Sequence, residues 1–271
     1  MSISLNKIQT HPSTGEICLV VPCFNEAKRL SLESFDELLR TGWIHLLAVN
    51  DGSTDGTGDI LEAFARTQPN FSVIHLKKNS GKGEAVRQGC IKAFSPRLTH
   101  VGYFDADFAT PPQEIIRIAQ VAQANMAKSI VMGSRVKTLG SDIRRSTSRH
   151  LFGRIFATLA SIAIQEPIYD TQCGLKLLRT SGDFHTYFAT RFTSRWLFDI
   201  EIMFRLKQQR GLSGKKRLDN QVLEVPLLVW HEVVGSKTRA RDGVIALGQL
   251  LRLSMRYRWN MSLLSRANNH R

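Results

Sequence analysis

Short apolar runs alternate with amphipathic segments along the first half of the chain. Four runs of strand type occupy residues 17–21, 43–49, 71–76 and 101–104, and segments with helical spacing separate them. Alternating strands and helices predict a mostly parallel sheet with helices on both faces. We therefore predict an α/β fold.

The second half continues with the same two kinds of segment. The pattern predicts strands at 129–133 and 222–229, a loop leading into a strand over 166–178, and helices at 151–164, 196–206 and 243–259. No 18-residue apolar span occurs, so we expect no transmembrane helix. We find no repeat or linker, and we predict a loose arm (1–16), one domain (17–238) and a basic amphipathic helix or tail (239–271).

The apolar run 101–104 ends in two carboxylates, Asp105 and Asp107, with Ala106 between them. Buried carboxylates are costly unless they are paired or bind metal, so we place both at the carboxyl end of the strand, where open α/β sheets bind ligands. The chain must turn at Ala106 if both are to serve one site. Such a pair suits Mg²⁺ or Mn²⁺ held jointly with substrate phosphates. The alternative is a solvated acidic turn.

Polar or glycine-rich residues follow the other strands. Asp51 can accept hydrogen bonds from a base or a ribose, and Gly52 allows close approach of the backbone. Gly81-Lys82-Gly83 opens a helix, so its amides and the Lys82 ammonium can face phosphate, although the spacing is not that of a P-loop. These junctions share one edge of the sheet, and we expect one crevice to contain Glu26, Asp51, Lys82 and Asp105. Ordinary turn chemistry is the alternative.

The net charge of +14 is unevenly distributed. Residues 135–154 carry six Lys/Arg and one Asp, and residues 236–271 carry eight and one. This charge fits nucleic acid, an anionic membrane or phosphorylated ligands, and a solvated face is the alternative. Arg135, Arg144, Arg145 and Arg149 are candidates for binding a second anion, since Arg can bind phosphate in bidentate fashion.

The cysteines and the amino terminus suggest a compartment. Cys18, Cys23, Cys90 and Cys173 form no CxxC pair, which indicates reduced structural thiols rather than zinc ligands or disulfides. The first residues are polar and lack a signal-peptide core, which points to the cytosol.

Five short motifs occur in a particular order: Val21-Pro22-Cys23-Phe24-Asn25-Glu26, Asn50-Asp51-Gly52-Ser53, Gly81-Lys82-Gly83, Asp105-Ala106-Asp107 and Gly133-Ser134-Arg135. Together they resemble family 2 glycosyltransferases of GT-A fold. Three later stretches resemble the dolichyl-phosphate β-glucosyltransferase branch, to which dolichyl-phosphate mannose synthases are near relatives. These stretches are Asp170–Lys176, Trp196–Glu201, and Trp230-His231-Glu232 with Gly235-Ser236-Lys237. The resemblance covers about residues 17–238.

The resemblance implies an inverting, metal-dependent transfer of a hexose from a nucleotide sugar, UDP-glucose, to a polyprenyl (dolichyl-like) phosphate. Residues 17–135 would then bind the nucleotide sugar and residues 136–238 the acceptor. The implied donor-binding residues are Pro22, Phe24, Glu26, Asp51, Gly52, Ser53, Lys82, Asp105 and Ala106. The implied metal ligands are Asp105 and Asp107, and the implied catalytic residues are Asp107, Arg135 and Asp199. The implied acceptor-binding residues are Arg149, Gln172, Trp196 and Lys237.

Two departures from the family pattern stand out. Asn50 replaces the first acid of the usual Asp-Asp-Gly-Ser, and Ala109 stands where mannose synthases have a metal-binding Gln. The second departure favours the glucosyl branch.

The acceptor decides whether a general base is needed. A phosphate monoester, with a second pKa of about 6, is largely dianionic at neutral pH and can attack without a base. Asp199 or Glu201 would act as a base only for a hydroxyl acceptor, a soluble metabolite or a glycan. The alternative for both residues is salt bridging.

A polyprenyl acceptor implies contact with a membrane. The helices at 151–164 and 243–259 can lie on an anionic surface with Arg252, Arg256 and Arg258 near the headgroups, peripherally on the cytoplasmic face. Ordinary core helices and a soluble acceptor are the alternative. We expect no nucleic-acid partner, because a non-catalytic basic module would leave Asp105 and Asp107 without a role.

Overall fold

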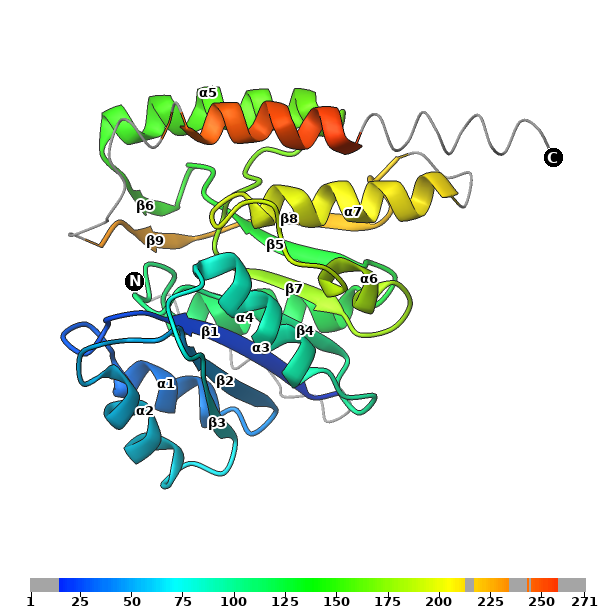
Figure 1. The fold of residues 1–271 in the computed structure, drawn as a ribbon. Coiled ribbons are helices and arrows are strands. Elements are labelled where there is room, and N and C mark those ends of the chain that lie inside the picture. Colours follow the sequence, from blue (N-terminus) through cyan, green and yellow to red (C-terminus); the bar gives the residue numbers. More distant parts are fainter. Residues whose placement is uncertain (1–14, 213–216, 234–242, 244, 258–271) are drawn as a thin grey trace, which may run out of the picture.

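The protein is built around one mixed sheet (Figure 1). The computed structural model describes residues 15–212, 217–233, 243 and 245–257, and only the backbone of 147–152 and 212. The sheet has seven strands in the order β3-β2-β1-β4-β7-β5-β8. Their bounds are β1 (Ile17–Cys23), β2 (Ile44–Asn50), β3 (Phe71–His75), β4 (His100–Tyr103), β5 (Ile130–Ser134), β7 (Lys176–Arg179) and β8 (Val222–Pro226).

The sheet is mostly parallel, as predicted. β1 pairs in parallel with β2 and β4, β2 with β3, and β5 with β8, whereas β7 is antiparallel to both β4 and β5. Lys176 at the start of β7 pairs with Tyr103 at the end of β4. The loop before β7 therefore lies at the carboxyl edge of the parallel strands, beside the carboxylate pair.

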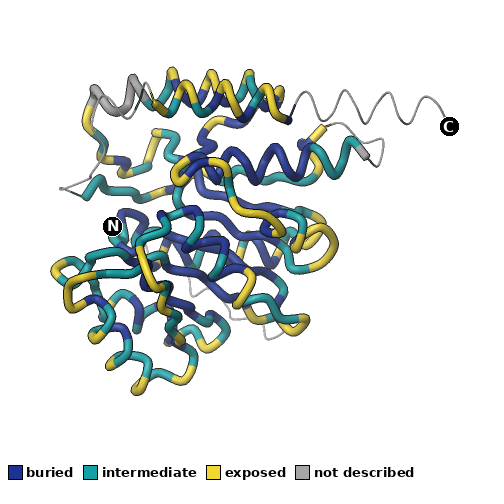
Figure 2. Tube along the Cα trace, in the orientation of Figure 1, coloured by how far each residue is buried: buried dark blue, intermediate teal, exposed yellow. Residues whose placement is uncertain are grey.

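Helices cover both faces of the sheet, because alternate strand residues point to opposite sides. Cys18 and Val20 belong to a core cluster with residues of α3, α6 and α7, and Ile17, Leu19 and Val21 belong to a second cluster with residues of α1 and α4. Figure 2 shows burial along the central strands and along most of α7. The helices are α1 (Leu32–Leu39), α2 (Thr57–Ala65), α3 (Lys82–Ala93), α4 (Pro112–Ala124), α5 (Thr147–Ile164), α6 (Phe184–Phe188) and α7 (Phe198–Leu212).

The sequence pattern missed α4. The helix begins at Pro112, because proline is favoured in the first turn of a helix, where its missing N–H costs nothing. Ile115, Ile118 and Ala122 follow at helical spacing and are buried. The pattern also missed α6 and a small parallel sheet of β6 (Asp142–Arg144) and β9 (Val229–His231). Because β8 ends at Pro226, the predicted strand 222–229 is two strands.

A helix over residues 245–257 lies with α5 at one end of the molecule, over α7 (Figure 1). Its inner side buries Leu250, Leu253 and Tyr257 in the core, while Leu247, Leu251 and Met255 are exposed. Within the described residues, no helix combines the length and the apolarity needed to cross a bilayer. The predicted loose arm lies almost entirely outside the described residues.

Candidate active site

Hydrogen bonds join the loops that follow β1 and β2 at the carboxyl edge of the sheet. The backbone N–H of Asn25 donates to Ser53 Oγ at 3.0 Å, and the N–H of Thr54 donates to Asn25 Oδ1 at 2.8 Å. The N–H of Asp51 donates to the carbonyl of Cys23 at 2.8 Å. These two loops therefore form one surface. They contain Phe24, Glu26 and Ser53, which the resemblance places at the nucleoside.

Asp51 fastens the loop after β3 to the same surface. Its carboxylate accepts hydrogen bonds from the backbone N–H groups of Ser80 (2.7 Å) and Gly81 (2.8 Å), and the residue is buried. Gly52 has a φ of +64°, and a Cβ there would lie 2.5 Å from the carbonyl carbon of Lys78. Asp51 thus positions the start of α3, a structural role that the sequence did not predict.

The chain turns directly after β4, as the carboxylate pair requires. Phe108 has a φ of +50°, and its N–H donates to the carbonyl of Asp105 at 3.2 Å. Ala106 is buried inside this turn, while Asp107 Oδ1 accepts the N–H of Ala109 at 3.1 Å. Asp105 forms an ion pair with Lys82, the first residue of α3. The Asp51–Gly81 and Lys82–Asp105 contacts therefore link three of the four residues expected in one crevice. The fourth, Glu26, forms an ion pair with Arg29 in the loop after β1.

The pKa values of the two carboxylates are shifted in opposite directions. Burial would raise the pKa of Asp105, but the Lys82 ammonium, together with Arg135 and Lys176, holds that pKa below its ordinary value. Burial and the neighbouring Asp105 charge raise the pKa of Asp107. Lys82 and Arg29 also act on Asp107, but burial and the Asp105 charge outweigh them, so a bound cation would relieve the repulsion at Asp107.

The loop before β7 packs directly against Asp105. A Cβ on Gly174 would lie 2.3 Å from Asp105 Oδ2, so only glycine fits there. Behind this contact, the buried Lys176 ammonium donates to the carbonyl of Cys173 at 2.7 Å and to Asp199 Oδ1 at 2.6 Å. The Tyr103 hydroxyl donates to the same carboxylate oxygen at 2.6 Å. These buried contacts fix the loop that supports Asp105.

Asp199 and Glu201 are held in buried ion pairs, which is the alternative interpretation that the sequence left open. Asp199 pairs with Lys176, and Glu201 pairs with Arg205 at 3.0 Å. Both carboxylates are almost fully buried. Asp199 Oδ1 thus accepts from both Lys176 and Tyr103 inside the protein, which favours the salt-bridging alternative over a role as a base.

Arg135 follows the end of β5, and its guanidinium forms an ion pair with Asp170. Its Nε and Nη2 donate to the two carboxylate oxygens at 2.7 and 2.8 Å, and its backbone N–H donates to Oδ2 at 3.0 Å. The Trp230 ring lies 5.4 Å from the guanidinium. The N–H of His231 donates to the carbonyl of Ala109 at 2.9 Å, which joins β9 to the turn that carries Asp107.

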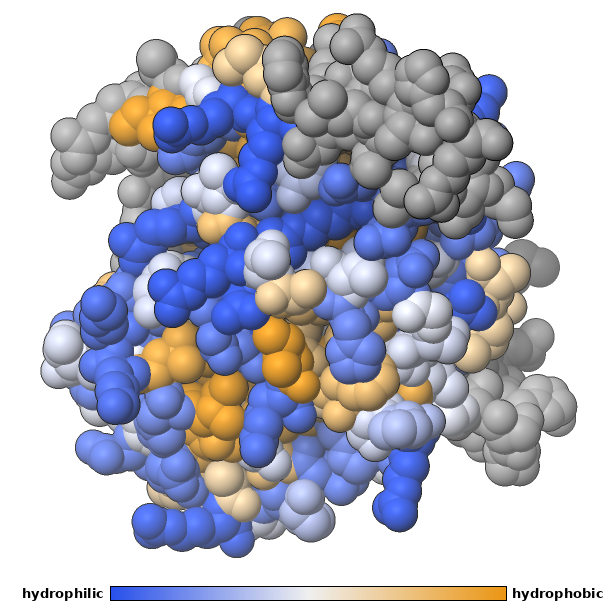
Figure 3. All heavy atoms as spheres, turned by 45° about the vertical axis from the view of Figure 1, so that its right-hand side comes forward, coloured by the Kyte–Doolittle hydropathy of each residue, from blue (hydrophilic) through white to orange (hydrophobic). Residues whose placement is uncertain are grey.

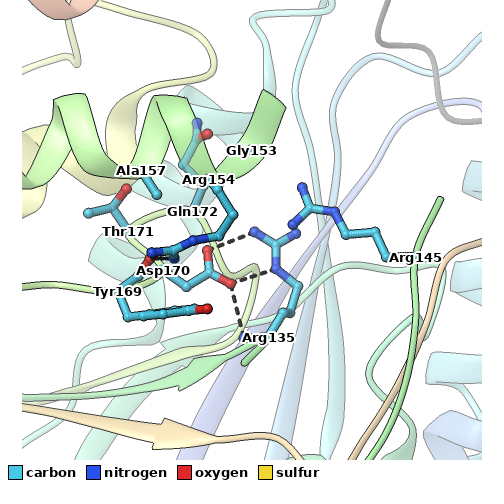
Figure 4. Close-up of a pocket in the computed structure, with 9 residues that line it drawn as sticks. All are labelled: Arg135, Arg145, Gly153, Arg154, Ala157, Tyr169, Asp170, Thr171 and Gln172. Atoms are coloured by element: carbon cyan, nitrogen blue, oxygen red, sulfur yellow. Dashed lines mark hydrogen bonds and ion pairs between the residues drawn. The ribbon is translucent and has the colours of Figure 1, made fainter. Parts of the chain in front are cut away.

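A basic recess opens beside this pair (Figure 4). Arg135, Arg145 and Arg154 line it, with Asp170 as the only acidic lining residue, so the wall is net positive. The Arg154 guanidinium lies 3.5 Å from the centroid of the Tyr169 ring. A Cβ on Gly153 would lie 2.5 Å from Arg145 Nη2, so a glycine in α5 makes room for that arginine. Gln172 also lines the recess.

The other predicted acceptor residues are less closely placed. Trp196 is 58% exposed, in the segment before α7, where the neighbouring Arg195 carbonyl accepts the N–H of Gly83. Arg144 points elsewhere, paired with Asp142 at 2.9 Å. The side chain of Arg149 and all of Lys237 lie outside the described residues.

The residues present fit a divalent cation that shares its ligands with a substrate. No group of three His, Cys, Asp or Glu residues that could hold a metal occurs in the described part of the chain. Asp105 and Asp107 would thus supply two hard oxygen ligands. Mg²⁺-type ions commonly complete their shell with substrate phosphates and water.

The mostly parallel sheet has the GT-A fold of solved glycosyltransferase structures, and the family and the curated relatives of the chain identify it as a glycosyltransferase. More specifically, the chain belongs to glycosyl transferase family 2, whose family model matches residues 18–191. The resemblance drawn from the motifs is thereby confirmed.

Curated relatives refine the comparison. A dolichyl-phosphate β-glucosyltransferase of Trichomonas vaginalis is 30% identical over 261 residues, which cover 91% of this chain and 73% of that protein. The Saccharomyces cerevisiae dolichyl-phosphate β-glucosyltransferase is also 30% identical, over 95% of this chain and 80% of its own. Among solved structures, glucosyl-3-phosphoglycerate synthase from Mycobacterium tuberculosis with Mn²⁺ and UDP has a TM-score of 0.58 at 18% identity, covering 91% and 80% of the two chains.

Several residues that build the site escaped prediction as site residues: Asp170, Gly174, Lys176 and Arg154. Asp170, Gly174 and Lys176 lie in a stretch that was noted only as a family motif. The spacing of an acid, a glycine and a lysine within seven residues was the available signal. Arg154 lies in the charge-rich segment 135–154, but nothing in that segment distinguishes it from its neighbours.

Proposed function

We propose that the protein transfers glucose from UDP-glucose to a polyprenyl phosphate of the dolichyl type, with inversion and with the help of Mg²⁺ or Mn²⁺. The observation that carries the proposal is the arginine-lined recess beside the Arg135–Asp170 pair. Arg135 lines the recess and also acts electrostatically on Asp105. One arrangement can thus hold a donor diphosphate and a second, separate phosphate.

On the donor side, the roles follow from charge. Asp105 and Asp107 would hold the cation together with the diphosphate, and the Lys82 ammonium at the start of α3 would contact the diphosphate. The N–H groups of Gly81 and Gly83 are bonded within the protein, to Asp51 and to the Arg195 carbonyl. When bound, the cation offsets the negative charge that develops on the departing nucleoside diphosphate. Pro22, Phe24, Glu26, Gly52 and Ser53 would surround the nucleoside.

On the acceptor side, the recess favours a phosphate monoester. Arg135, Arg145, Arg154 and Gln172 would orient the acceptor phosphate, and we place Arg149, Trp196 and Lys237 around the same substrate. A phosphate oxygen forms the new bond to the anomeric carbon as the bond from that carbon to the diphosphate breaks. Because the acceptor is already anionic, no side chain has to remove a proton. The burial of Asp199 and Glu201 in ion pairs supports this choice over a hydroxyl acceptor.

We also propose that the end of the molecule formed by α5 and the helix 245–257 contacts a lipid surface. Both helices carry exposed apolar side chains: Ile155, Leu159, Ile162, Ile245, Leu247, Leu251 and Met255. Figure 3 shows apolar surface at the top of the molecule. Arg252 and Arg256 are exposed beside them. An apolar face with basic flanks suits an anionic interface, and it would bring the recess at α5 close to a membrane-held acceptor.

A transfer screen tests the proposal. UDP- and GDP-sugars are each incubated with Mn²⁺ or Mg²⁺ and with a short polyprenyl phosphate, the matching polyprenol or neither, and products are identified by mass spectrometry. We expect glucosylated polyprenyl phosphate from UDP-glucose, and none from the polyprenol. Transfer to the polyprenol, or donor hydrolysis that the lipid phosphate does not stimulate, would overturn the acceptor assignment.

The lipid contact has its own test. Flotation with vesicles of neutral and anionic phospholipids is compared for the wild type, Leu251→Glu with Met255→Glu, and Ile91→Glu. Ile91 is a 45%-exposed apolar residue on α3 and serves as the matched control. We expect the double variant alone to lose vesicle binding. Equal binding by all three proteins contradicts a role for this face.

A further inference from the structure

Lys82 occupies an unusual position among the charges of the site. Its ammonium forms an ion pair with Asp105 Oδ1, and the Phe198 ring lies 5.8 Å from the same nitrogen. The Lys82 side chain is 26% exposed and that of Asp105 is 40% exposed, so the pair lies at the edge of solvent and not in the core. Unlike the ion pair between Lys176 and Asp199, it can open without uncovering a buried charge.

The backbone beneath Lys82 is firmly held. Asp51 accepts the N–H groups of Ser80 and Gly81, and the Arg195 carbonyl accepts the N–H of Gly83 at 3.1 Å. The flexible part of the residue is therefore its four-carbon side chain, which can carry the ammonium from one anion to another around a fixed point.

The contacts of the Asp105 carboxylate leave little room for two cations to bind it at the same time. Oδ1 faces Lys82, and Oδ2 lies against Gly174. A divalent cation that binds Asp105 must therefore compete with the lysine. Within the described residues, Asp107 forms no salt bridge and accepts one hydrogen bond, from the N–H of Ala109. Competition between the lysine and the cation is therefore concentrated on Asp105.

We propose that Lys82 makes cation binding depend on the donor: in the unliganded enzyme its ammonium holds Asp105, and it moves to the diphosphate when nucleotide arrives, which frees Asp105 for the divalent cation. This rests on the proposed function, because it takes a nucleoside diphosphate and a divalent cation as ligands of this edge. The lysine thus weakens binding of the cation when nucleotide is absent and favours binding of the cation when nucleotide is bound. Binding of either ligand assists the other, as thermodynamic linkage requires.

The exchange predicts effects of opposite sign in one variant. Lys82→Met removes the competing charge, so Mn²⁺ alone should bind about tenfold more tightly than to the wild type, while UDP in the absence of metal should bind about tenfold more weakly. The factor by which UDP strengthens Mn²⁺ binding should shrink accordingly. A lysine that only supports the fold would weaken both ligands or neither.

The measurement is direct binding, with no turnover. Free Mn²⁺ is followed by electron paramagnetic resonance in titrations with and without UDP, and UDP binding is followed by calorimetry, for the wild type, Lys82→Met, Lys82→Gln and Lys82→Arg. Lys78→Met, which removes an exposed lysine from the same loop, is the matched control. Lys82→Gln substitutes for the Met variant if the latter does not fold, and Lys82→Arg should keep weak binding of Mn²⁺ alone.

The outcomes separate the two claims. If the wild type binds no Mn²⁺ even with UDP, the proposed metal-dependent function fails. If the wild type binds Mn²⁺ with UDP, but the uncharged Lys82 variants bind Mn²⁺ alone no more tightly than the wild type or the Lys78→Met control, only the exchange is refuted.

Discussion

Gly174→Ala is the sharpest perturbation that the structure offers. The new Cβ would lie 2.3 Å from Asp105 Oδ2, whereas ordinary contact begins at 3.4 Å. The carboxylate must therefore shift by about 1 Å, since the loop is held by Lys176 and by the Asp170–Arg135 pair. A misplacement of about 1 Å in a catalytic constellation can cost about 100-fold in rate, equivalent to about 2.7 kcal/mol in the activation barrier.

The assay is transfer from UDP-glucose at saturating Mn²⁺, with thermal unfolding followed in parallel. Gly211→Ala is the matched control, because a Cβ there meets nothing within 4 Å. We expect kcat/KM to fall about 100-fold in Gly174→Ala and to remain unchanged in Gly211→Ala. A folded Gly174→Ala protein with activity within about threefold of the wild type would refute the reasoning, because Asp105 could then move without consequence.

Two further predictions concern the supports of the site. Lys176→Met leaves the Asp199 carboxylate buried without its cation, and breaking a buried pair in this way costs about 3–5 kcal/mol; urea unfolding measures the loss, and a change below about 1 kcal/mol contradicts the assignment. Burial would raise the pKa of Asp170, but the Arg135 guanidinium holds it well below its ordinary value of about 4. A depressed pKa stabilises the folded state above the unfolded value, and this contribution disappears as pH falls below about 4. The free energy of unfolding should therefore drop less between pH 7 and pH 3 in Asp170→Asn than in the wild type, and equal drops would count against the pair.

The repeating strand-and-helix pattern made most of the sheet predictable. Strands such as 17–21 and 43–49 are short apolar runs that end in polar loops, and in a parallel sheet such ends must share an edge. Local pattern could not give the direction of β7, because that depends on where the preceding loop packs. It could not give α4 either, because proline both ends strands and begins helices.

Site residues were predictable where the functional groups are close together in sequence. They were unpredictable where the site depends on contacts between residues that are distant in sequence. Asp105 and Asp107 stand out in the sequence, and the turn between them is present. The fate of Asp199 depended on Lys176, which lies 23 positions away in sequence, so spacing could not distinguish a base from a buried ion pair. Arg154 likewise joins Arg135 in one recess only because α5 crosses the end of β5.

The most direct test is the rate of glucose transfer to polyprenyl phosphate by Asp107→Asn at saturating Mn²⁺. The Asp107 side chain contacts only the Ala109 N–H among the described hydrogen bonds, so the variant should keep the wild-type melting temperature. The account predicts a rate at least about 100-fold below that of the wild type, as is typical when one group that stabilises transition-state charge is removed. A folded variant that transfers glucose at the wild-type rate would contradict the claim that this carboxylate pair holds the donor's cation.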